Sequence, residues 1–180
     1  LDSEMTLPYE FHQYWLRVDD RDLEKFLLQL TLLEVEEIKE IVKEHQLSPE
    51  KRSGQSLLAD EITELIHGRD AVIESRLAAE ALFGEGILTI EMFEALRGIV
   101  QETKISRSVL SSEEGLIESL VLSELASSKG EARRLLKQGG VSVNRKKTSA
   151  SSIELDETIG GKYVLLQKGK KQRNILIVEN

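Results

Sequence analysis

The sequence of 180 residues contains no cysteine, only two prolines and few aromatic residues, which make up 4% of the chain. The absence of cysteine excludes disulfides and thiolate metal sites. Three histidines, His12, His45 and His67, are too scattered to suggest a zinc site, so no metal-binding residue is expected. No apolar run approaches the roughly 20 residues of a transmembrane helix, so no membrane partner is expected.

The N-terminal stretch LDSEMTLPYEF lacks the basic and apolar regions of a signal peptide, so we expect a protein that is not secreted. The chain begins with Leu1 instead of methionine, which indicates a fragment or a processed chain. An apolar share of 40% is enough for a core. A charged share of 31%, mixed in sign, argues against wholesale disorder.

Charge of the two signs is unevenly distributed along the chain, which has a formal net charge of -8. Residues 1–126 hold 12 Lys and Arg against 27 Asp and Glu, a net charge of −15. Residues 127–180 hold 12 Lys and Arg against 5 Asp and Glu, a net charge of +7. A basic module favours a polyanion partner, because each neutralised phosphate releases condensed counterions. A solvated charged face is the alternative explanation.

Apolar residues recur at helical spacing through the first hundred residues, without a competing strand pattern. The pattern predicts helices at residues 69–83 and 90–96, among others. Residues 99–111 lose this periodicity and hold three serines and a threonine, so we interpret them as a linker. The expected fold is mainly α and then α+β, with a helical domain at 1–98, the linker at 99–111 and a second domain at 112–180.

Residues 111–140 carry the signals of two capped helices. Ser111 and Glu114 have capping-box spacing, and so do Ser128 and Glu131. The second box predicts a helix from Lys129 to about Gln138, which Gly139-Gly140 ends because glycine adopts the left-handed conformation without strain. Strands are then predicted at 141–144, 162–167 and 175–178.

Basic residues fall on three elements of this second module. A helical wheel places Lys129, Arg133, Arg134 and Lys137 on one face, where no carboxylate is expected because Glu131 belongs to the cap. A turn holds Arg145, Lys146 and Lys147, and a hairpin tip holds Lys168, Lys170, Lys171 and Arg173. These eleven cations are the candidate RNA-binding residues. Tyr163 is expected to pack in the core or at an edge, so recognition of shape and phosphate in folded RNA fits better than base stacking.

The segment SSKGEARRLLKQGGVSVN resembles the αL RNA-binding motif, in which two helices precede a small sheet and the second helix presents basic residues to RNA. The serine cap, EARRLL, the glycine stop and the V-x-V-N strand fall in the order of that motif. Arg145 departs from it, because many members have glycine after the asparagine.

The segment LPYEFHQYWLRVDDRDLEKFL resembles the region just after the catalytic domain of bacterial-type tyrosyl-tRNA synthetases, with His12 where tyrosine is usual. LLADEITELIHG and RLAAEALFG resemble the helical domain of the same family, and GKK followed by ILIV resembles its final strand. The resemblance covers nearly the whole chain. It implies a helical anticodon-binding domain followed by an αL domain that lies near the anticodon stem and variable arm of tRNA(Tyr).

The resemblance also implies an activity for the parent enzyme, which would attach tyrosine to tRNA(Tyr) with ATP and Mg²⁺ and would form a homodimer through its catalytic domain. This chain contains no HIGH-type or KMSKS-type sequence, so no catalytic residue and no cofactor is expected in it. The expected location is the cytoplasm if the chain is bacterial, or the mitochondrial matrix if it is eukaryotic.

Asp19, Asp20 and Asp22 lie in the turn that resembles the anticodon-contact region of the family, and carboxylates can accept hydrogen bonds from guanine. Helix capping is their alternative role. Two other functions stay open: a free-standing protein that binds structured RNA, including a mitochondrial-type cofactor for group I intron splicing, and an adaptor whose basic face meets an acidic protein.

Overall fold

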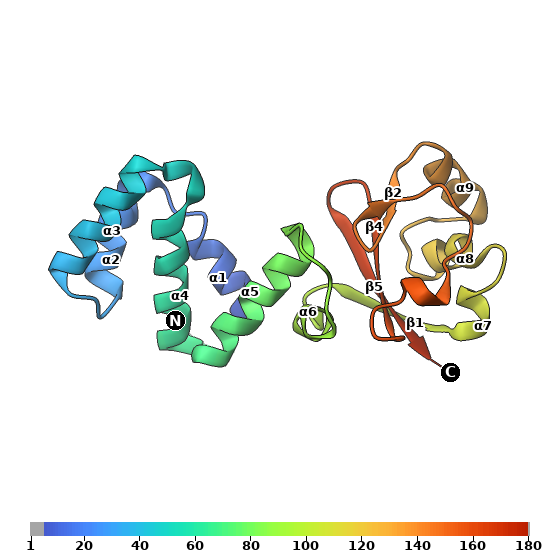
Figure 1. Ribbon diagram of the computed structural model, residues 1–180, viewed down its shortest axis with the longest axis horizontal. Coiled ribbons are helices and arrows are strands. Elements are labelled where there is room, and N and C mark those ends of the chain that lie inside the picture. Colours follow the sequence, from blue (N-terminus) through green and yellow to red (C-terminus); the bar gives the residue numbers. More distant parts are fainter. Residues whose placement is uncertain (1–5, 180) are drawn as a thin grey trace. The chain divides into compact units, whose positions relative to one another are not determined.

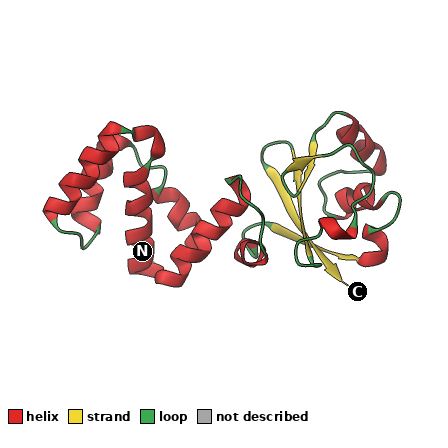
Figure 2. Ribbon diagram, viewed as in Figure 1, coloured by secondary structure: helices red, strands yellow, loops and turns green. Residues whose placement is uncertain are grey.

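The computed structural model describes residues 6–179, and the chain divides into two compact units with the boundary between Ala79 and Glu80. The N-terminal unit is helical, whereas the C-terminal unit combines helices with a sheet (Figures 1 and 2). This arrangement confirms the prediction of a mainly α fold followed by an α+β fold. None of the helices that the structure describes is long and apolar enough to cross a membrane.

Helices of the N-terminal unit surround one apolar core. In chain order they are α1 (Pro8–Trp15), α2 (Asp20–Leu30), α3 (Val35–Leu47), a 3-10 turn (Pro49–Lys51), α4 (Ser53–His67) and α5 (Arg69–Phe83), which extends past the unit boundary. Phe11 and Trp15 of α1 pack with Leu23 and Leu27 of α2 and Leu58 of α4. These residues recur at helical spacing, and so each amphipathic helix buries one stripe.

A buried carboxylate ties α1, α4 and α5 together within this unit. Asp60 is 8% exposed, and its Oδ1 lies 2.9 Å from Nε2 of His12. The guanidinium of Arg76 donates to both of its oxygens. Burial raises the pKa of the Asp60 carboxyl, but the hydrogen bonds from His12 and Arg76 outweigh burial and lower that pKa overall.

Replacement of Asp60 by asparagine is expected to lower the free energy of unfolding by about 2 kcal/mol at pH 7, because Arg76 loses its charged partner. A lowered pKa in the folded state gives stability that is present above the ordinary carboxyl pKa of about 4 and is lost as the pH falls through the lowered value. The difference between parent and Asp60→Asn should therefore shrink below about pH 4. Urea denaturation at pH 7 and at low pH measures the difference in unfolding free energy between the two proteins. An equal difference at both pH values would contradict the role of the charged Asp60 carboxylate.

The C-terminal unit contains a five-stranded sheet and the helices that cover it. Its elements are α6 (Ile90–Leu96), β1 (Gln101–Ser106), α7 (Arg107–Leu110), α8 (Gly115–Leu122), α9 (Lys129–Lys137), β2 (Val141–Val143), β3 (Lys146–Lys147), a 3-10 turn (Leu155–Glu157), β4 (Tyr163–Lys168) and β5 (Gln172–Glu179). The predicted helix at 90–96 and the strands at 141–144, 162–167 and 175–178 are confirmed within a few residues.

The order of strands in the sheet is β1-β5-β4-β2-β3, with β1 parallel to β5 and the other pairs antiparallel. Leu116 and Leu120 of α8 and Leu136 of α9 are buried against strand residues such as Val164 and Leu176. Helix α9 is thereby held with one face in the core and the other face exposed to solvent.

The predicted linker at 99–111 is wrong, because most of it is regular structure. Residues 101–106 form β1, which pairs along its whole length with β5, and Ile105 and Leu110 are buried. The sequence QETKIS is mostly polar because an edge strand has one neighbour and buries few side chains. Polar composition therefore concealed a strand.

Neither predicted capping box forms completely, but the serine cap of the second one does, and its Glu131 carboxylate accepts from the N–H of Ser127 instead of that of Ser128. Ser128 caps α9 through its Oγ, which accepts from the backbone N–H of Glu131 at 3.2 Å. Ser111 does not cap a helix: Ser106 caps α7, and α8 begins after Glu114 without a side-chain cap. The carboxylate of Glu114 is used elsewhere, as described below.

Candidate nucleic-acid interface

Helix α9 is fixed at its start by a set of hydrogen bonds to Glu131. The carboxylate of Glu131 accepts from the backbone N–H of Ser127 at 2.8 Å and from the Ser127 hydroxyl at 2.6 Å. It also lies 3.0 Å from Nζ of Lys168. The Ser127 hydrogen bonds, and then Lys168, lower the pKa of Glu131 to about 2. Glu131 is therefore charged at neutral pH and keeps Lys168 occupied.

Two of the four cations on α9 are already paired with α8. Nζ of Lys129 lies 2.6 Å from Glu118, and Nη2 of Arg133 lies 2.5 Å from Glu114. Arg133 lowers the pKa of the Glu114 carboxyl, mainly through this hydrogen bond. No carboxylate of α9 itself lies on this face, as predicted, but two carboxylates from outside the helix pair with its cations. Glu114 precedes α8 and Glu118 lies within it, and the sequence pattern did not show that both would meet α9.

Arg134 and Lys137 make up the other half of this face. Both side chains are exposed, and no hydrogen bond or ion pair to either is found within residues 6–179. They lie in the last turns of α9, before the glycine stop that the sequence predicted. Gly139 adopts a φ of 65°, a left-handed conformation that glycine tolerates. The unoccupied charge of α9 is thus concentrated at its C-terminal end.

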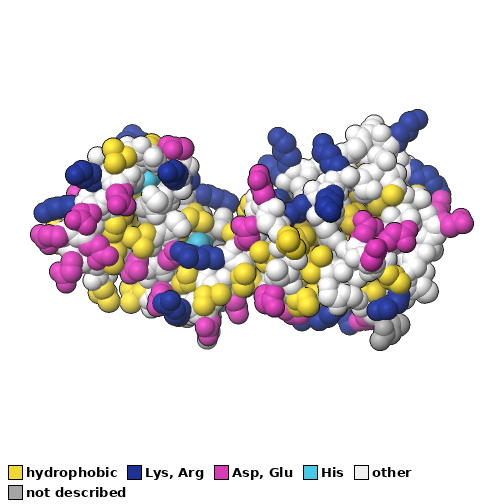
Figure 3. All heavy atoms as spheres, viewed as in Figure 1, with side chains coloured by type: hydrophobic (Ala, Val, Ile, Leu, Met, Phe, Trp, Pro, Cys, Tyr) yellow, Lys and Arg dark blue, Asp and Glu magenta, His cyan; other side chains and the backbone are white. Residues whose placement is uncertain are grey.

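All three basic elements meet at the segment of residues 139–143. Helix α9 ends there, the hairpin tip is joined to it by a 2.9 Å hydrogen bond from Gly169 N–H to Gly140 C=O, and β3 pairs with β2. Lys170 and Lys171 at the tip and Lys146 and Lys147 on β3 are exposed. Figure 3 shows blue Lys and Arg side chains gathered along one edge of the C-terminal unit.

Arg145 and Arg173 hold the end of α5 instead of standing free. The guanidinium of Arg145 donates to the carbonyls of Ala81 (3.1 Å), Gly86 (2.7 Å) and Glu80. Nη2 of Arg173 donates to the carbonyl of Leu82 at 3.1 Å. The last carbonyls of a helix have no partner within it, and two arginines from the sheet supply donors here.

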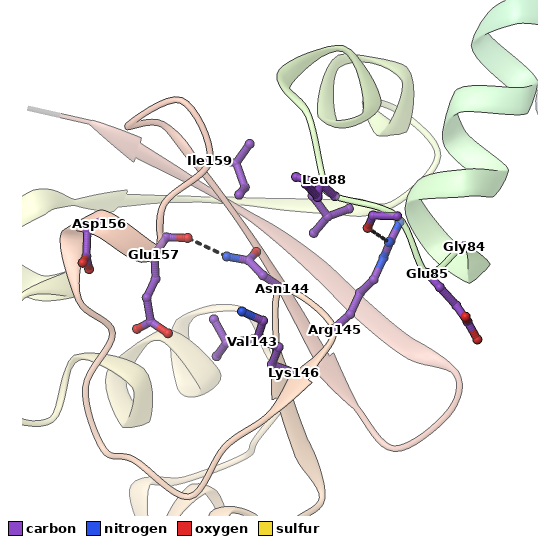
Figure 4. A pocket seen from close by; sticks show the side chains of 12 residues that line it. Gly84, Glu85, Leu88, Val143, Asn144, Arg145, Lys146, Asp156, Glu157 and Ile159 are labelled. Carbon is purple, nitrogen blue, oxygen red and sulfur yellow. Dashed lines mark hydrogen bonds between the residues drawn. The ribbon is translucent and has the colours of Figure 1, made fainter.

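Arg145 belongs to a turn that also borders an open pocket of about 750 Å³. Asn144 and Arg145 have φ of 46° and 68°, a left-handed conformation that residues with a side chain rarely adopt. Figure 4 shows Asn144 facing Glu157, whose carbonyl accepts from Nδ2 at 2.6 Å, and Arg145 reaching towards the 84–88 segment. The asparagine of the V-x-V-N motif therefore fixes the turn from inside.

Replacing Arg145 with alanine is expected to reduce the stability of the C-terminal unit by about 1–2 kcal/mol, because the α5 carbonyls lose their donors. RNA affinity should change by less than about threefold, since the guanidinium is not available to phosphate. Thermal unfolding measures the stability, and filter binding on the same samples measures the RNA affinity. Unchanged stability together with a large loss of affinity would show that Arg145 contacts RNA.

The eleven predicted cations thus fall into two groups. Five make contacts inside the unit: Lys129, Arg133, Arg145, Lys168 and Arg173. The other six are exposed and have no hydrogen-bond or ion-pair partner in the described part of the chain: Arg134, Lys137, Lys146, Lys147, Lys170 and Lys171. We call this second group the free cations.

The three aspartates predicted to contact the anticodon, Asp19, Asp20 and Asp22, also differ in their contacts. Asp19 caps α2 and pairs with Arg21, whose side-chain and backbone hydrogen bonds lower the pKa of Asp19 to about 2. Asp20 accepts from Gln55 and lies 3.2 Å from Nε2 of His45. Asp22 is exposed, and its carboxylate has no hydrogen bond or ion pair within residues 6–179.

Comparison with known proteins gives two adjoining family matches. Residues 98–176 match the tyrosine–tRNA ligase SYY-like C-terminal domain. Residues 1–84 match the class I tRNA synthetases for W and Y.

Similar sequences include several tyrosine–tRNA ligases. Tyrosine–tRNA ligase 1 of Bacillus cereus is 36% identical over 174 residues, which is 96% of this chain and 41% of the relative. The ligase of Oceanobacillus iheyensis is 35% identical, over 100% of this chain and 42% of the relative. The crystal structure of a C-terminally truncated mitochondrial tyrosyl-tRNA synthetase from Coccidioides posadasii is 40% identical, over 41% of this chain and 20% of that one, with a TM-score of 0.40.

The chain therefore spans about two fifths of the length of the curated relatives that it matches. The basic α9, its serine cap and glycine stop, and the sheet behind it lie in the part that matches the ligase C-terminal domain. The chain belongs to the tyrosyl-tRNA synthetase family and corresponds to the C-terminal region of its members.

Proposed function

We propose that this chain is the tRNA-binding region of a tyrosine–tRNA ligase. The six free cations support this proposal most directly, because they gather around one segment of the unit that matches the ligase C-terminal domain. Exposed, unpaired Lys and Arg side chains supply the counterion release that drives RNA binding. The RNA is tRNA(Tyr), and the free cations contact the phosphates of its anticodon stem and variable arm.

The helical unit recognises the bases of the anticodon, whereas the free cations attract the phosphates of the tRNA. Among the three candidate aspartates, Asp22 is the best placed to contact the anticodon, because Asp19 and Asp20 are engaged within the unit. A carboxylate without a partner can accept from the amino groups of a base. The acidic surface of the helical unit repels phosphate elsewhere, so that contact is limited to places with matching geometry.

The whole enzyme would activate tyrosine with ATP and Mg²⁺, transfer it to the tRNA, and form a homodimer through its catalytic domain. This chain would contribute no catalytic group and no cofactor ligand. The compartment would be the cytoplasm in a bacterium or the mitochondrial matrix in a eukaryote. Group I intron RNA is a second ligand only for a mitochondrial-type protein. A free-standing RNA-binding role is not favoured, because synthetase family matches extend over both units.

Titration against three RNAs tests the proposal: tRNA(Tyr), an unrelated tRNA and a plain duplex of similar length. We expect tRNA(Tyr) to bind most tightly at physiological salt and all three to tighten at low salt. Equal affinity for the three RNAs would indicate a general RNA-binding protein without preference for tRNA(Tyr). No binding at low salt would exclude both roles and would favour an adaptor that binds an acidic protein.

A further inference from the structure

Phe83, at the C-terminal end of α5, leaves most of its side chain exposed to solvent. Its side chain is 64% exposed, whereas Phe93 and Tyr163 in the same unit are completely buried and stacked on each other. An exposed aromatic ring offers a ligand a large, flat apolar surface.

Arg173 fixes the position of the Phe83 ring. Its guanidinium lies over the ring with a centroid distance of 4.9 Å, and its Nη2 is bonded to the carbonyl of Leu82 at 3.1 Å. One face of the ring is therefore covered by an anchored cation. The exposure of the side chain leaves the rest of the ring open to solvent. A flat, pre-positioned pair of this kind loses little conformational entropy when a planar ligand stacks on it.

The surroundings of this pair favour a nucleotide. Arg173 pairs across the sheet with Gln167, which pairs on with Ser142 and then Lys147, so these side chains form a polar row on one face. The hairpin tip with its two free lysines, Lys170 and Lys171, is two residues from Arg173 in sequence.

Two carboxylates also flank the end of α5. Glu80 accepts from the backbone N–H of Gly86 at 3.4 Å, and Glu85 is exposed. Their charge disfavours phosphate on the side of residues 80–86. A nucleotide on Phe83 is thereby directed with its phosphate towards the hairpin tip.

We infer that Phe83 and Arg173 form a stacking platform for one unpaired base of the bound RNA, with the adjoining phosphate on Lys170 or Lys171. Bases stack on aromatic rings and on arginine planes regardless of their identity, so the platform recognises an unstacked nucleotide and not a sequence. This inference rests on the proposed function, because it assigns one contact within the same RNA footprint.

Stacking and phosphate contact differ in their dependence on salt, and this difference provides the test. Phe83→Leu should weaken binding of tRNA(Tyr) by about fivefold or more, since a stacked base contributes about 1–3 kcal/mol. The slope of log affinity against log salt should not change, because no phosphate contact is lost. Phe83→Tyr should restore parental affinity. Lys171→Ala should instead flatten the slope by about one unit.

A fully paired duplex RNA is the matched control ligand, because it offers no unstacked base. Its affinity should be the same for the parent protein and for Phe83→Leu. Equal tRNA affinity of parent and Phe83→Leu would overturn the platform while leaving the proposed function intact. Loss of affinity for the duplex as well, or failure of Phe83→Tyr to restore binding, would also overturn it. If the parent protein bound no RNA, the proposed function itself would fail.

Discussion

Removing four free cations around the glycine stop should weaken tRNA binding on the order of 100-fold at low salt and flatten its salt dependence by about three units. The changes are Arg134→Ala and Lys137→Ala on α9 with Lys170→Ala and Lys171→Ala at the hairpin tip. Each side chain is exposed and without a partner in the described part of the chain, so each can release a counterion on meeting a phosphate. Fluorescence anisotropy over a range of salt concentrations gives both quantities.

A charge-matched control separates local contact from net charge. Four exposed lysines of the helical unit can be replaced by alanine: Lys25, Lys39, Lys43 and Lys51. This variant carries the same net charge as the first but keeps the free cations. Binding should fall by less than about threefold, because salt screens exposed charges that make no direct phosphate contact. Comparable losses of tRNA affinity in the two variants would mean that the free cations do not form the tRNA-binding surface.

Gly115→Ala should destabilise the C-terminal unit by about 3 kcal/mol or more, the largest stability effect that we expect from a single methyl group. A Cβ at this position would lie 2.0 Å from the carbonyl oxygen of Leu110 and 2.7 Å from that of Val109. Both are backbone atoms at the end of α7, so neither can rotate away. The junction of α7 and α8 would have to open, and α8 is the helix on which α9 packs.

Gly130→Ala is the control for this prediction. Gly130 lies inside α9, and the nearest atom to its added Cβ is Oγ of Ser128 at 3.8 Å. Alanine should stabilise the helix there by up to about 1 kcal/mol, because glycine loses more backbone entropy on folding. Thermal or urea unfolding compares the two variants. A Gly115→Ala variant as stable as the parent would show that the contact between α7 and α8 is looser than described.

Local signals in the sequence predicted α9 well. Ser128, Glu131 and the glycines after Gln138 act through hydrogen bonds and backbone conformations within a few residues, and all of them appear in the structure. The helical periodicity that gave residues 69–83 and 90–96 is local in the same sense. Such features can be predicted because their physical cause lies inside the segment that displays them.

Features that depend on distant neighbours were missed. Strand β1 is polar because it lies at a sheet edge, and only its partner β5, about seventy residues later, makes it a strand. Arg145 has the charge of an RNA contact, yet its guanidinium meets carbonyls of α5. Glu114 has the spacing of a capping residue, but its carboxylate pairs with Arg133 and makes no capping hydrogen bond to α8. Charge and spacing do not reveal which groups folding brings together.

The division of the α9 face into free and paired cations can be tested with two neighbours on one helix. Arg133 and Arg134 have the same charge and are both exposed, but within residues 6–179 only Arg133 has a carboxylate partner, Glu114. The measurement is the salt dependence of tRNA(Tyr) binding for Arg134→Ala and for the double variant Glu114→Ala/Arg133→Ala, which removes the ion pair without changing the net charge. We predict that the slope flattens by about one unit in Arg134→Ala and stays at its parental value in the double variant. A double variant that flattens the slope as much as Arg134→Ala would contradict this account.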